Sequence, residues 1–568
     1  MLDKILRVNL SELKVSTEPV LPEYHTLGGR ALTSRIISDE VKANCEPLGG
    51  LNKVVLAPGL LAGTTAPSSG RLSVGAKSPL TGTIKESNVG GTAAQALAKF
   101  GLKAVVIEGQ ASEGWYILRI GLDSTGLVRF DELAGKDNYA VAVELRQRYG
   151  VKNTVISIGL AGERLYANST IGVTDVEGNP SRHAGRGGLG AVLGSKRIKA
   201  IVIENSSISS FRPSEAFTQG ARQLAEAITS NPVSGGALTA FGTAILVNTV
   251  NGAGGLPTRN FSDGRFEGVN QISGEKLAET VTNRGGKCGH PCQLGCVIKC
   301  SNIYVDQSGN YITSGLEYET LALLGSNCGI EDLDAIARMD RLCDQFGLDT
   351  IETGGAIAVA MEGGYLKFGD AQGAIDLVDE MGRGTPMGRL LGQGVQATGR
   401  ALGVTRIPVV KGQGLAAYDP RAIKGNGVVY ATSPMGADHT CGNAMGHPGV
   451  DPLKPEGQVD LSRDLQIFCT ALDATGLCLF TIFALGGNPN LINIVAILIN
   501  EIYGTSWNAE DLMGLGVATI AVEKEFNRQA GWTSAADRLP EFFTTETLPS
   551  TQTVFDVAED DMQTIFKA

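Results

Sequence analysis

The sequence predicts an α+β protein in which a strand-rich N-terminal domain is followed by two mainly α-helical domains. Three observations support this prediction. Short β-branched runs alternate with Gly, Pro and Ser turns up to about residue 208. Apolar residues then recur at helical spacing through most of the remaining chain. Glycines and a proline interrupt that spacing at 400–415, so we expect domains at 1–208, 209–405 and 406–568.

The first domain should contain both strands and helices. Expected strands are 53–56, 104–108, 115–118, 154–158 and 200–203, and expected helices are 92–100 and 138–148. In the helical part, Ser214 is expected to cap a helix whose apolar residues share one face, and Asn508 is expected to cap another. At 568 residues, the chain is too long for one hydrophobic core, which agrees with several domains.

Composition excludes some functions and favours a reducing compartment. A net charge of −11 argues against nucleic-acid binding, which needs a basic face. Ten cysteines, four of them in one short stretch, indicate metal binding in a cytoplasmic protein better than a disulfide scaffold. The start of the chain has no pattern of a signal peptide. The apolar stretch 477–499 is broken by Gly and Pro, so we expect a buried helix there and no membrane span.

The most informative stretch is 287–300, where Cys288, Cys292, Cys296 and Cys300 follow one another at intervals of four. Thiolates suit iron–sulfur clusters and zinc, and a short loop lets several of them converge. A cubane cluster needs four ligands, and Cys478 lies in a comparable setting far along the chain. Either triad of consecutive loop cysteines can supply the other three.

Cys478 ends the hexapeptide Asp-Ala-Thr-Gly-Leu-Cys, which resembles Asp-Gln-Phe-Gly-Leu-Asp at 344–349. Each hexapeptide follows a helical pattern, and its glycine stands where a helix would stop in a left-handed cap. The turn after such a stop offers backbone N–H groups and an Asp to a polar heterocycle, so two alike loops predict two alike ligands. Two ordinary helix ends are the alternative interpretation. The residues concerned are Asp344, Gly347, Leu348, Asp349, Asp473, Gly476 and Leu477.

Glycine-rich loops with arginines lie between the expected strands. Arg71 follows a Ser/Gly turn, and Arg182 and Arg186 flank another. Guanidinium groups bind phosphate in bidentate fashion, and glycine lets the backbone approach it closely. Neither loop has the spacing of a Walker motif or of a dinucleotide-binding motif.

These motifs together resemble the aldehyde:ferredoxin oxidoreductases. The paired Asp-x-x-Gly-Leu motifs, the Cys loop and the ordered N-terminal segments 67–71, 77–82, 87–91 and 184–191 carry the resemblance over essentially the whole chain. It implies a bis-pterin tungsten or molybdenum cofactor at the interdomain interface, beside a [4Fe–4S] cluster. It implies Cys292, Cys296, Cys300 and Cys478 as cluster ligands. The family's usual loop is Cys-x2-Cys-x3-Cys, whereas every gap here is three residues, so Cys288 is an alternate ligand.

The resemblance also implies the roles of individual residues. Arg71 would bridge pterin and cluster, Asn88 would contact a magnesium that joins the pterin phosphates, and Arg182 and Arg186 would hold those phosphates. Glu319 and His439 would manage protons during oxidation of an aldehyde to a carboxylate. From the residues alone, Glu317 and Glu319 are interpreted as a solvated acidic pair of which at most one faces a ligand.

The implied electron acceptor is ferredoxin or a ferredoxin-like subunit, in a homo-oligomer or a hetero-complex. Two other interpretations stay open. The catalytic subunits of tungsten aryl-CoA (benzoyl-CoA type) reductases look similar, with Cys328 as a thiol near the metal. A non-catalytic scaffold module would instead bind zinc or an iron–sulfur centre through the four loop cysteines.

Overall fold

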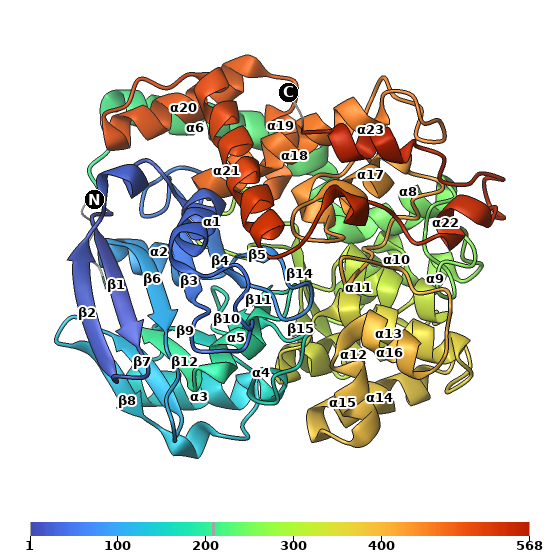
Figure 1. Ribbon diagram of the computed structural model, residues 1–568, viewed down its shortest axis with the longest axis horizontal. Helices are drawn as coiled ribbons and strands as arrows, with labels where there is room; N and C mark the ends of the chain where they lie inside the picture. Colours follow the sequence, from blue (N-terminus) through green and yellow to red (C-terminus); the bar gives the residue numbers. More distant parts are fainter. Residues whose placement is uncertain (1, 207–210, 567–568) are drawn as a thin grey trace.

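The computed structural model describes residues 2–206 and 211–566, and its N-terminal part contains two six-stranded sheets (Figure 1). The first sheet has the order β2-β1-β6-β3-β4-β5. Its strands are β1 (Lys4–Asn9), β2 (Lys14–Pro19), β3 (Val54–Pro58), β4 (Leu72–Lys77), β5 (Ile84–Val89) and β6 (Leu102–Glu108). The second sheet contains β7 (Tyr116–Ile120), β8 (Thr125–Arg129), β9 (Thr154–Ser157), β10 (Ile171–Val173), β11 (Arg182–Ala184) and β12 (Ile198–Ile203). All five predicted strands are therefore present.

The two sheets repeat one topology. Read from its β8 edge, the second sheet has the order β8-β7-β12-β9-β10-β11, which is the order of the first sheet with each number raised by six. In each sheet one pair is parallel, β1 with β6 and β7 with β12, and the other pairs are antiparallel. The N-terminal part is therefore an internal structural duplication, which the sequence patterns did not indicate.

Helices connect and cover these sheets. They are α1 (Gly29–Glu40), α2 (Ala93–Lys99), α3 (Asn138–Tyr149), α4 (Leu160–Glu163) and α5 (Leu189–Ser195). Helix α1 packs on β3 and β4 and also contacts α18 and α21 from the C-terminal part. Buried residues of both sheets form one shared core, which includes Leu56, Val105, Ile156 and Ile201, and other residues of each sheet pack in separate clusters.

After residue 210 the chain is mainly helical, as predicted, except for the sheet β13-β14-β15 and the pair β16-β17. The strands are β13 (Lys287–His290), β14 (Ser301–Val305), β15 (Tyr311–Ser314), β16 (Val409–Val410) and β17 (Gln413–Gly414). The longer helices are α6 (Glu215–Ser230), α8 (Leu246–Gly252), α10 (Gly274–Asn283), α11 (Tyr318–Leu323), α12 (Leu333–Phe346), α13 (Thr350–Glu362), α14 (Ala371–Arg383), α15 (Pro386–Leu391), α16 (Gly394–Ala401), α17 (Lys424–Thr432), α18 (Gln458–Thr475), α20 (Pro489–Tyr503), α21 (Ala509–Gln529) and α23 (Glu559–Thr564).

Both predicted N-caps are present. The Ser214 side chain accepts a hydrogen bond from the Phe217 N–H at the start of α6, and Asn508 forms a capping box with Asp511 at the start of α21. These contacts satisfy N–H groups that a helix start leaves unpaired.

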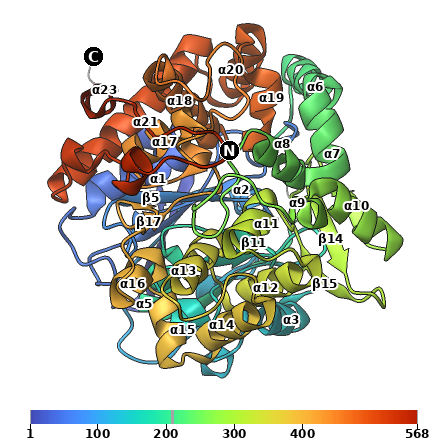
Figure 2. The ribbon, with the colours of Figure 1, turned by 90° about the vertical axis from the view of Figure 1, so that its right-hand side faces the viewer.

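The helices of the C-terminal part form two groups. In Figure 1, α12 to α16 lie together at the lower right and α17, α18, α20 and α21 above them, with the two sheets at the left. Figure 2 shows the same two groups from the side, with α6 and α10 at the right. The domain boundaries at 208 and 405 stay a prediction.

Two stretches are apolar enough to cross a membrane by length and composition. One is Pro232–Gly252, and the other is the bent pair Gln458–Thr475 and Leu479–Leu485. The first changes between π, α and 3-10 geometry and packs on α6, α10 and β13, which accounts for its apolar residues. The stretch 477–499 contains two short helices followed by α20, which buries Val495, Leu498 and Ile499 on one side. The stretch is thus helical on both sides of the predicted break, and α20 is buried along one side.

Candidate metal centre and active site

Four cysteines from distant parts of the chain come together beside the first sheet. Cys292, Cys296 and Cys300 lie in the loop between β13 and β14, and Cys478 follows α18; all four are buried. Ser68 joins the two segments. Its N–H donates to Gly295 O at 2.9 Å, its carbonyl accepts from Cys478 N–H at 2.9 Å, and its hydroxyl accepts from Val297 N–H at 3.2 Å.

The thiols influence one another electrostatically. A hydrogen bond with Cys296 raises the pKa of the Cys292 thiol, and the same contact lowers the pKa of Cys296. Burial raises the pKa of Cys478, where Arg71 acts in the opposite direction and Cys292 adds to the rise. A positively charged metal centre would stabilise these thiolates. Its charge would compensate for the hydration that the buried sulfur atoms have lost.

Cys288 lies apart from this group. It is half-buried and packs against the core of the helical part, whereas Cys296, Cys300 and Cys478 share a different core cluster. Burial raises the pKa of Cys288, and no other thiol contributes to that rise. The geometry thus favours the triad Cys292, Cys296 and Cys300 with Cys478.

A single zinc ion fits the cysteines less well than a cluster. A zinc tetrathiolate needs each sulfur about 2.3 Å from one ion. Among the residues that the structure describes, no three His, Cys, Asp or Glu side chains are placed to hold one metal ion. Ligands of a [4Fe–4S] cluster can lie further apart because each binds a different iron atom. The four thiols therefore fit a cluster.

The paired hexapeptides end α12 and α18 in the same way. Gly347 has φ of 75° and Gly476 has φ of 81°, so both helices end in the predicted left-handed cap. Each loop then pairs with the strand that faces it. Arg71 N–H donates to Gly476 O at 3.1 Å, and Thr170 N–H donates to Gly347 O at 2.8 Å. The residue that ends each hexapeptide, Cys478 or Asp349, donates its own N–H to the same neighbouring segment.

Each loop also has an aspartate with a basic partner. Asp473 lies 3.6 Å from Arg30, whose guanidinium forms a second ion pair with Glu523 at 2.8 Å. Asp344 lies 3.1 Å from His183 Nε2. Burial raises the pKa of Asp473, although Arg30 acts in the opposite direction.

The three predicted arginines have different surroundings. Arg71 is half-buried, its buried Nε is unpaired, and its electrostatic neighbours are Cys478, Cys292, Cys300 and Asp473. A side chain on Gly90 would come within 2.9 Å of Arg71 and 3.4 Å of the Cys292 sulfur, so glycine lets these two groups meet. Arg182 is buried, its Nε is also unpaired, and it donates to Ser301 Oγ at 2.9 Å.

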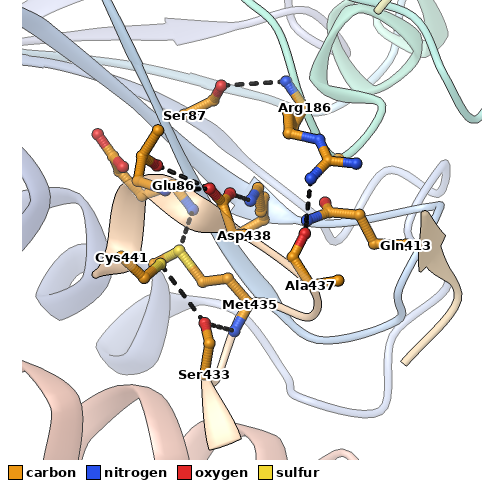
Figure 3. A network of polar contacts seen from close by, with 12 residues as sticks. Glu86, Ser87, Arg186, Gln413, Ser433, Met435, Ala437, Asp438 and Cys441 are labelled. Carbon is orange, nitrogen blue, oxygen red and sulfur yellow. Dashed lines mark hydrogen bonds and ion pairs between the residues drawn. The ribbon is translucent and has the colours of Figure 1, made fainter. Parts of the chain in front are cut away.

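Arg186, by contrast, is held by the protein. It donates to Ala437 O at 2.6 Å (Figure 3). It also donates to Gly414 O at 2.6 Å and lies 3.2 Å from an Asp349 oxygen. The structure thus separates two arginines that the sequence could not. Arg182 has a free donor for a ligand, whereas Arg186 ties the first hexapeptide to the 414 and 437 segments.

The predicted catalytic residues meet although 120 positions separate them. Glu319 stands in the first turn of α11, and His439 lies after α17. His439 Nε2 is 3.6 Å from Glu319 Oε1, and the other Glu319 oxygen accepts from Ala417 N–H at 2.8 Å. Burial raises the pKa of Glu319, with His439 and the Ala417 N–H acting in the opposite direction. A buried carboxyl group with a raised pKa beside an imidazole is typical of groups that exchange protons in active sites.

Beside His439, Asp438 lies 2.5 Å from Lys85 Nζ (Figure 3 draws this region). Burial alone would raise the pKa of Asp438, but Lys85 and Arg186 hold it well below its usual range. Asp438 is therefore a fixed negative charge that positions its neighbours, and Glu319 is the carboxyl group poised to titrate.

Several buried polar atoms at this site lack a hydrogen-bond partner. They are Arg71 Nε, Asn88 Nδ2, Arg182 Nε, Glu319 Oε1 and His439 Nδ1. Leaving such an atom unpaired costs about 1–3 kcal/mol, so native proteins rarely do so. A large polar cofactor with phosphate and ring heteroatoms would satisfy donors and acceptors together. The residues present therefore fit the pterin cofactor and cluster that the resemblance implies.

Comparison with known proteins agrees with this site. Residues 5–205 match the model of the aldehyde ferredoxin oxidoreductase N-terminal domain, and residues 219–567 match that of domains 2 and 3. The chain belongs to the aldehyde ferredoxin oxidoreductase family. It is therefore an oxidoreductase, as the sequence predicted, and the α+β fold with helical domains is confirmed.

Two relatives are similar over nearly their whole length. The tungsten-containing aldehyde ferredoxin oxidoreductase of Thermococcus kodakarensis is 34% identical over 96% of this chain and 92% of its own. That of Pyrococcus furiosus is 33% identical over the same shares. Among solved structures, the active-site complex of a benzoyl coenzyme A reductase with 1,5-dienoyl-CoA has a TM-score of 0.82 at 18% identity, covering 99% of this chain and 93% of that one. This last likeness shows the shared fold alone.

Two residues in this aldehyde ferredoxin oxidoreductase family member differ from the sequence-based interpretation. Cys328, the thiol considered for an aryl-CoA reductase, is fully buried in the helical core and contacts Leu323 O at 3.3 Å. Glu317 is not part of a solvated acidic pair. It is extended and precedes α11, so the helical i, i+2 argument fails, and Arg182 and Arg71 are among its electrostatic neighbours.

Proposed function

We propose that this protein oxidises aldehydes to carboxylic acids at a bis-pterin tungsten or molybdenum cofactor and passes the electrons through a [4Fe–4S] cluster to ferredoxin or a partner subunit. The observation that carries the proposal is the convergence of the Cys group, the two hexapeptide loops and the Glu319–His439 pair around unpaired buried polar atoms. The names of the relatives supply the metal and the substrate class.

The bound cofactor would supply the two-electron redox chemistry that side chains lack. Among the chain's residues, the backbone of the Gly347 and Gly476 loops, with Asp344 and Asp473, would hold one pterin each. Arg71, Arg182 and Asn88 have unpaired donors for phosphates or for water on a magnesium ion. Arg186 would position the first loop through Asp349.

The reaction needs proton acceptors. Oxidation of an aldehyde with water gives a carboxylic acid, two protons and two electrons. Glu319 would accept a proton from water or the aldehyde hydrate, because its free Oε1 is buried and its pKa is raised by burial. His439, 3.6 Å away, would receive it or orient the substrate oxygen through its unpaired Nδ1.

The four cysteines would hold the cluster, with Arg71 between them and Asp473 of the second loop. Electrons would therefore leave on the Cys478 side of the site. The ten cysteines are free thiols, which supports a reducing, cytoplasmic location.

The direct test uses anaerobically purified holoenzyme with benzyl viologen as acceptor. We expect aldehyde-dependent dye reduction, with a four-iron cluster visible by electron paramagnetic resonance in the reduced protein. An enzyme that acts on an aromatic CoA ester and on no aldehyde would contradict the proposal and favour the aryl-CoA reductase interpretation.

A further inference from the structure

The loop that carries the proposed cluster ligands reaches the surface at Leu294 and Gly295 and again at Lys299. Between the buried Cys292 and Cys296, Leu294 has 46% of its side chain exposed, and Gly295 is exposed beside it. Exposed large apolar side chains are informative when they stand at a functional point of the surface. Here Leu294 is separated by a single residue from each of the proposed ligands Cys292 and Cys296.

Leu294 lies at the edge of a surface depression of about 580 Å³. The depression is bounded by the Cys loop, the end of α2, one face of α6 and the 64–67 segment. Gly295 and Val297 of its lining are held by hydrogen bonds to Ser68, which also accepts from the Cys478 N–H. A partner in this depression therefore contacts the residues on either side of Cys296.

The charge of the depression is opposite to that of the protein. The chain carries a net charge of −11, yet the described residues lining the depression include Lys99 and Arg222 and no Asp or Glu. Lys99 forms no ion pair with any residue that the structure describes, and the exposed Arg222 forms an ion pair with its helical neighbour Glu226 at 2.9 Å. Ala66, Pro67, Ala225, Leu294 and Val297 give the lining an apolar share.

A second depression of about 240 Å³ shares Lys99 and Leu294 with the first and adds Arg146 and Lys152. Its lining also contains two carboxylates: Asp175, which accepts from three backbone N–H groups and from Ser181, and Glu204, which lies 3.7 Å from Arg119. Three basic side chains, Lys99 included, against these two acidic ones leave the lining with a net positive charge. Such a basic patch on an acidic protein steers an acidic partner toward it.

We propose that this patch, Leu294 with Lys99 and Arg222 around the α2–α6 depression, is the docking surface for a small acidic iron–sulfur electron carrier. The inference rests on the proposed function, which requires electrons to leave the cluster. It goes beyond that function by assigning the exit to one face. A shallow, partly apolar depression with a charged rim suits the small interfaces of transient electron-transfer complexes, which bury less than about 1,200 Å².

The test measures electron transfer from dithionite-reduced holoenzyme to an acidic two-cluster [4Fe–4S] ferredoxin by stopped flow, so it needs no aldehyde. In the variant Lys99→Glu with Arg222→Glu, we expect the second-order rate at low ionic strength to fall about tenfold. The deficit should shrink at about 1 M salt, where the Debye length is about 3 Å. Binding of oxidised ferredoxin, measured by calorimetry, should weaken in parallel.

Matched controls separate this effect from general charge or folding. Lys367→Glu with Arg383→Glu makes the same charge change on and near α14, where Arg383 also has an i, i+4 acidic partner, and should leave the ferredoxin rate within about twofold. Thr218→Lys adds a cation to the rim of the depression and should increase the rate, which a misfolded protein would not do.

The outcomes distinguish the two proposals. Unchanged ferredoxin rates in the α2–α6 variant, or equal losses in the α14 control, would overturn the docking surface. A wild-type dimer that the α2–α6 variant dissociates would also overturn it, because a second copy would then occupy the face. Aldehyde-dependent viologen reduction, which should stay unchanged in both variants, tests the proposed function separately.

Discussion

The two halves of the N-terminal part offer the same backbone to the two hexapeptide loops. After β3, Gly59 lies so close to Gly476 that an added Cβ would be 2.1 Å from its nitrogen; after β9, Gly159 would place a Cβ 2.1 Å from Phe346 O, next to Gly347. The loops differ in their last residue. One ends in Cys478 beside three other thiols, and the other ends in Asp349, which pairs with Arg186.

This difference shows how a duplicated fold can form an asymmetric site. Both halves can hold one ligand of the same kind, since their hydrogen bonds to the loops match. The residue that faces each loop, just before β4 or β10, is Arg71 in one half and Thr170 in the other. The arginine lies among the thiols, so the proposed electron exit belongs to one half, and the other half connects the site to the helical scaffold through Asp349 and Arg186.

The largest expected effect is that of Cys478→Ser. Because the fourth cluster ligand is lost, we expect less than about 1% of the aldehyde-dependent activity and loss of the cluster signal in electron paramagnetic resonance. Cys288→Ser is the matched control and should keep four irons per chain. A Cys478→Ser protein with full iron content and a normal spectrum would contradict the ligand assignment.

Glu319→Gln should come next, with kcat reduced about 10²–10⁴-fold because the proton acceptor is removed. As a base, Glu319 must be deprotonated, so wild-type kcat/KM should rise with pH through a pKa that burial has raised above the usual 4.5. That acid limb should vanish in Glu319→Gln. If the acid limb of the pH profile stays unchanged in Glu319→Gln, the titrating group is a residue other than Glu319.

The basic partners of the two aspartates should differ in importance. Arg30→Met leaves Glu523 and Asp473 buried without a cation, which should cost about 3–5 kcal/mol. His183→Gln removes a single contact to Asp344 and should cost about 1–3 kcal/mol. Denaturant midpoints of matched preparations measure both. Equal losses would show that the two loops are anchored alike.

The smallest effects should come from the caps. Gly347→Ala and Gly476→Ala would each strain a left-handed residue and place a Cβ 2.9 Å from backbone atoms of Gly159 and Gly59. We expect a loss of about 1–3 kcal/mol for each. Gly403 has φ of 70° with nothing near its Cβ, so Gly403→Ala should cost about 1 kcal/mol or less. If Gly347→Ala and Gly476→Ala lose no more stability than Gly403→Ala, the two loops can move away from Gly159 and Gly59.

Local features of this site were predictable, and long-range ones were not. The caps at Gly347 and Gly476 follow from helical spacing and from glycine's access to positive φ, and the strands follow from β-branched runs. The matching sheet orders depend on pairing between distant strands, which no local pattern records. The Arg30–Glu523 pair joins residues 493 positions apart, and a single sequence gives no sign of it.

Single side chains were also hard to predict where long-range contacts decide their surroundings, as for Glu317, Arg182 and Arg186. The sequence identified the loop of Arg182 and Arg186, but the acceptors that occupy Arg186 come from residues 414 and 437. Exposure of Leu294 likewise depends on how the Cys loop packs against Ser68. Motifs indicated which chemistry to look for, and tertiary contacts decided which member of each motif is free to perform it.

The proposed function requires that two equivalent loops hold one pterin each while four distant thiols hold one cluster. The most direct measurement is the content of tungsten or molybdenum, pterin and iron in anaerobically purified protein. We expect one such metal, two pterins and four irons per chain. One pterin per chain, or bound zinc with no iron, would contradict this assignment.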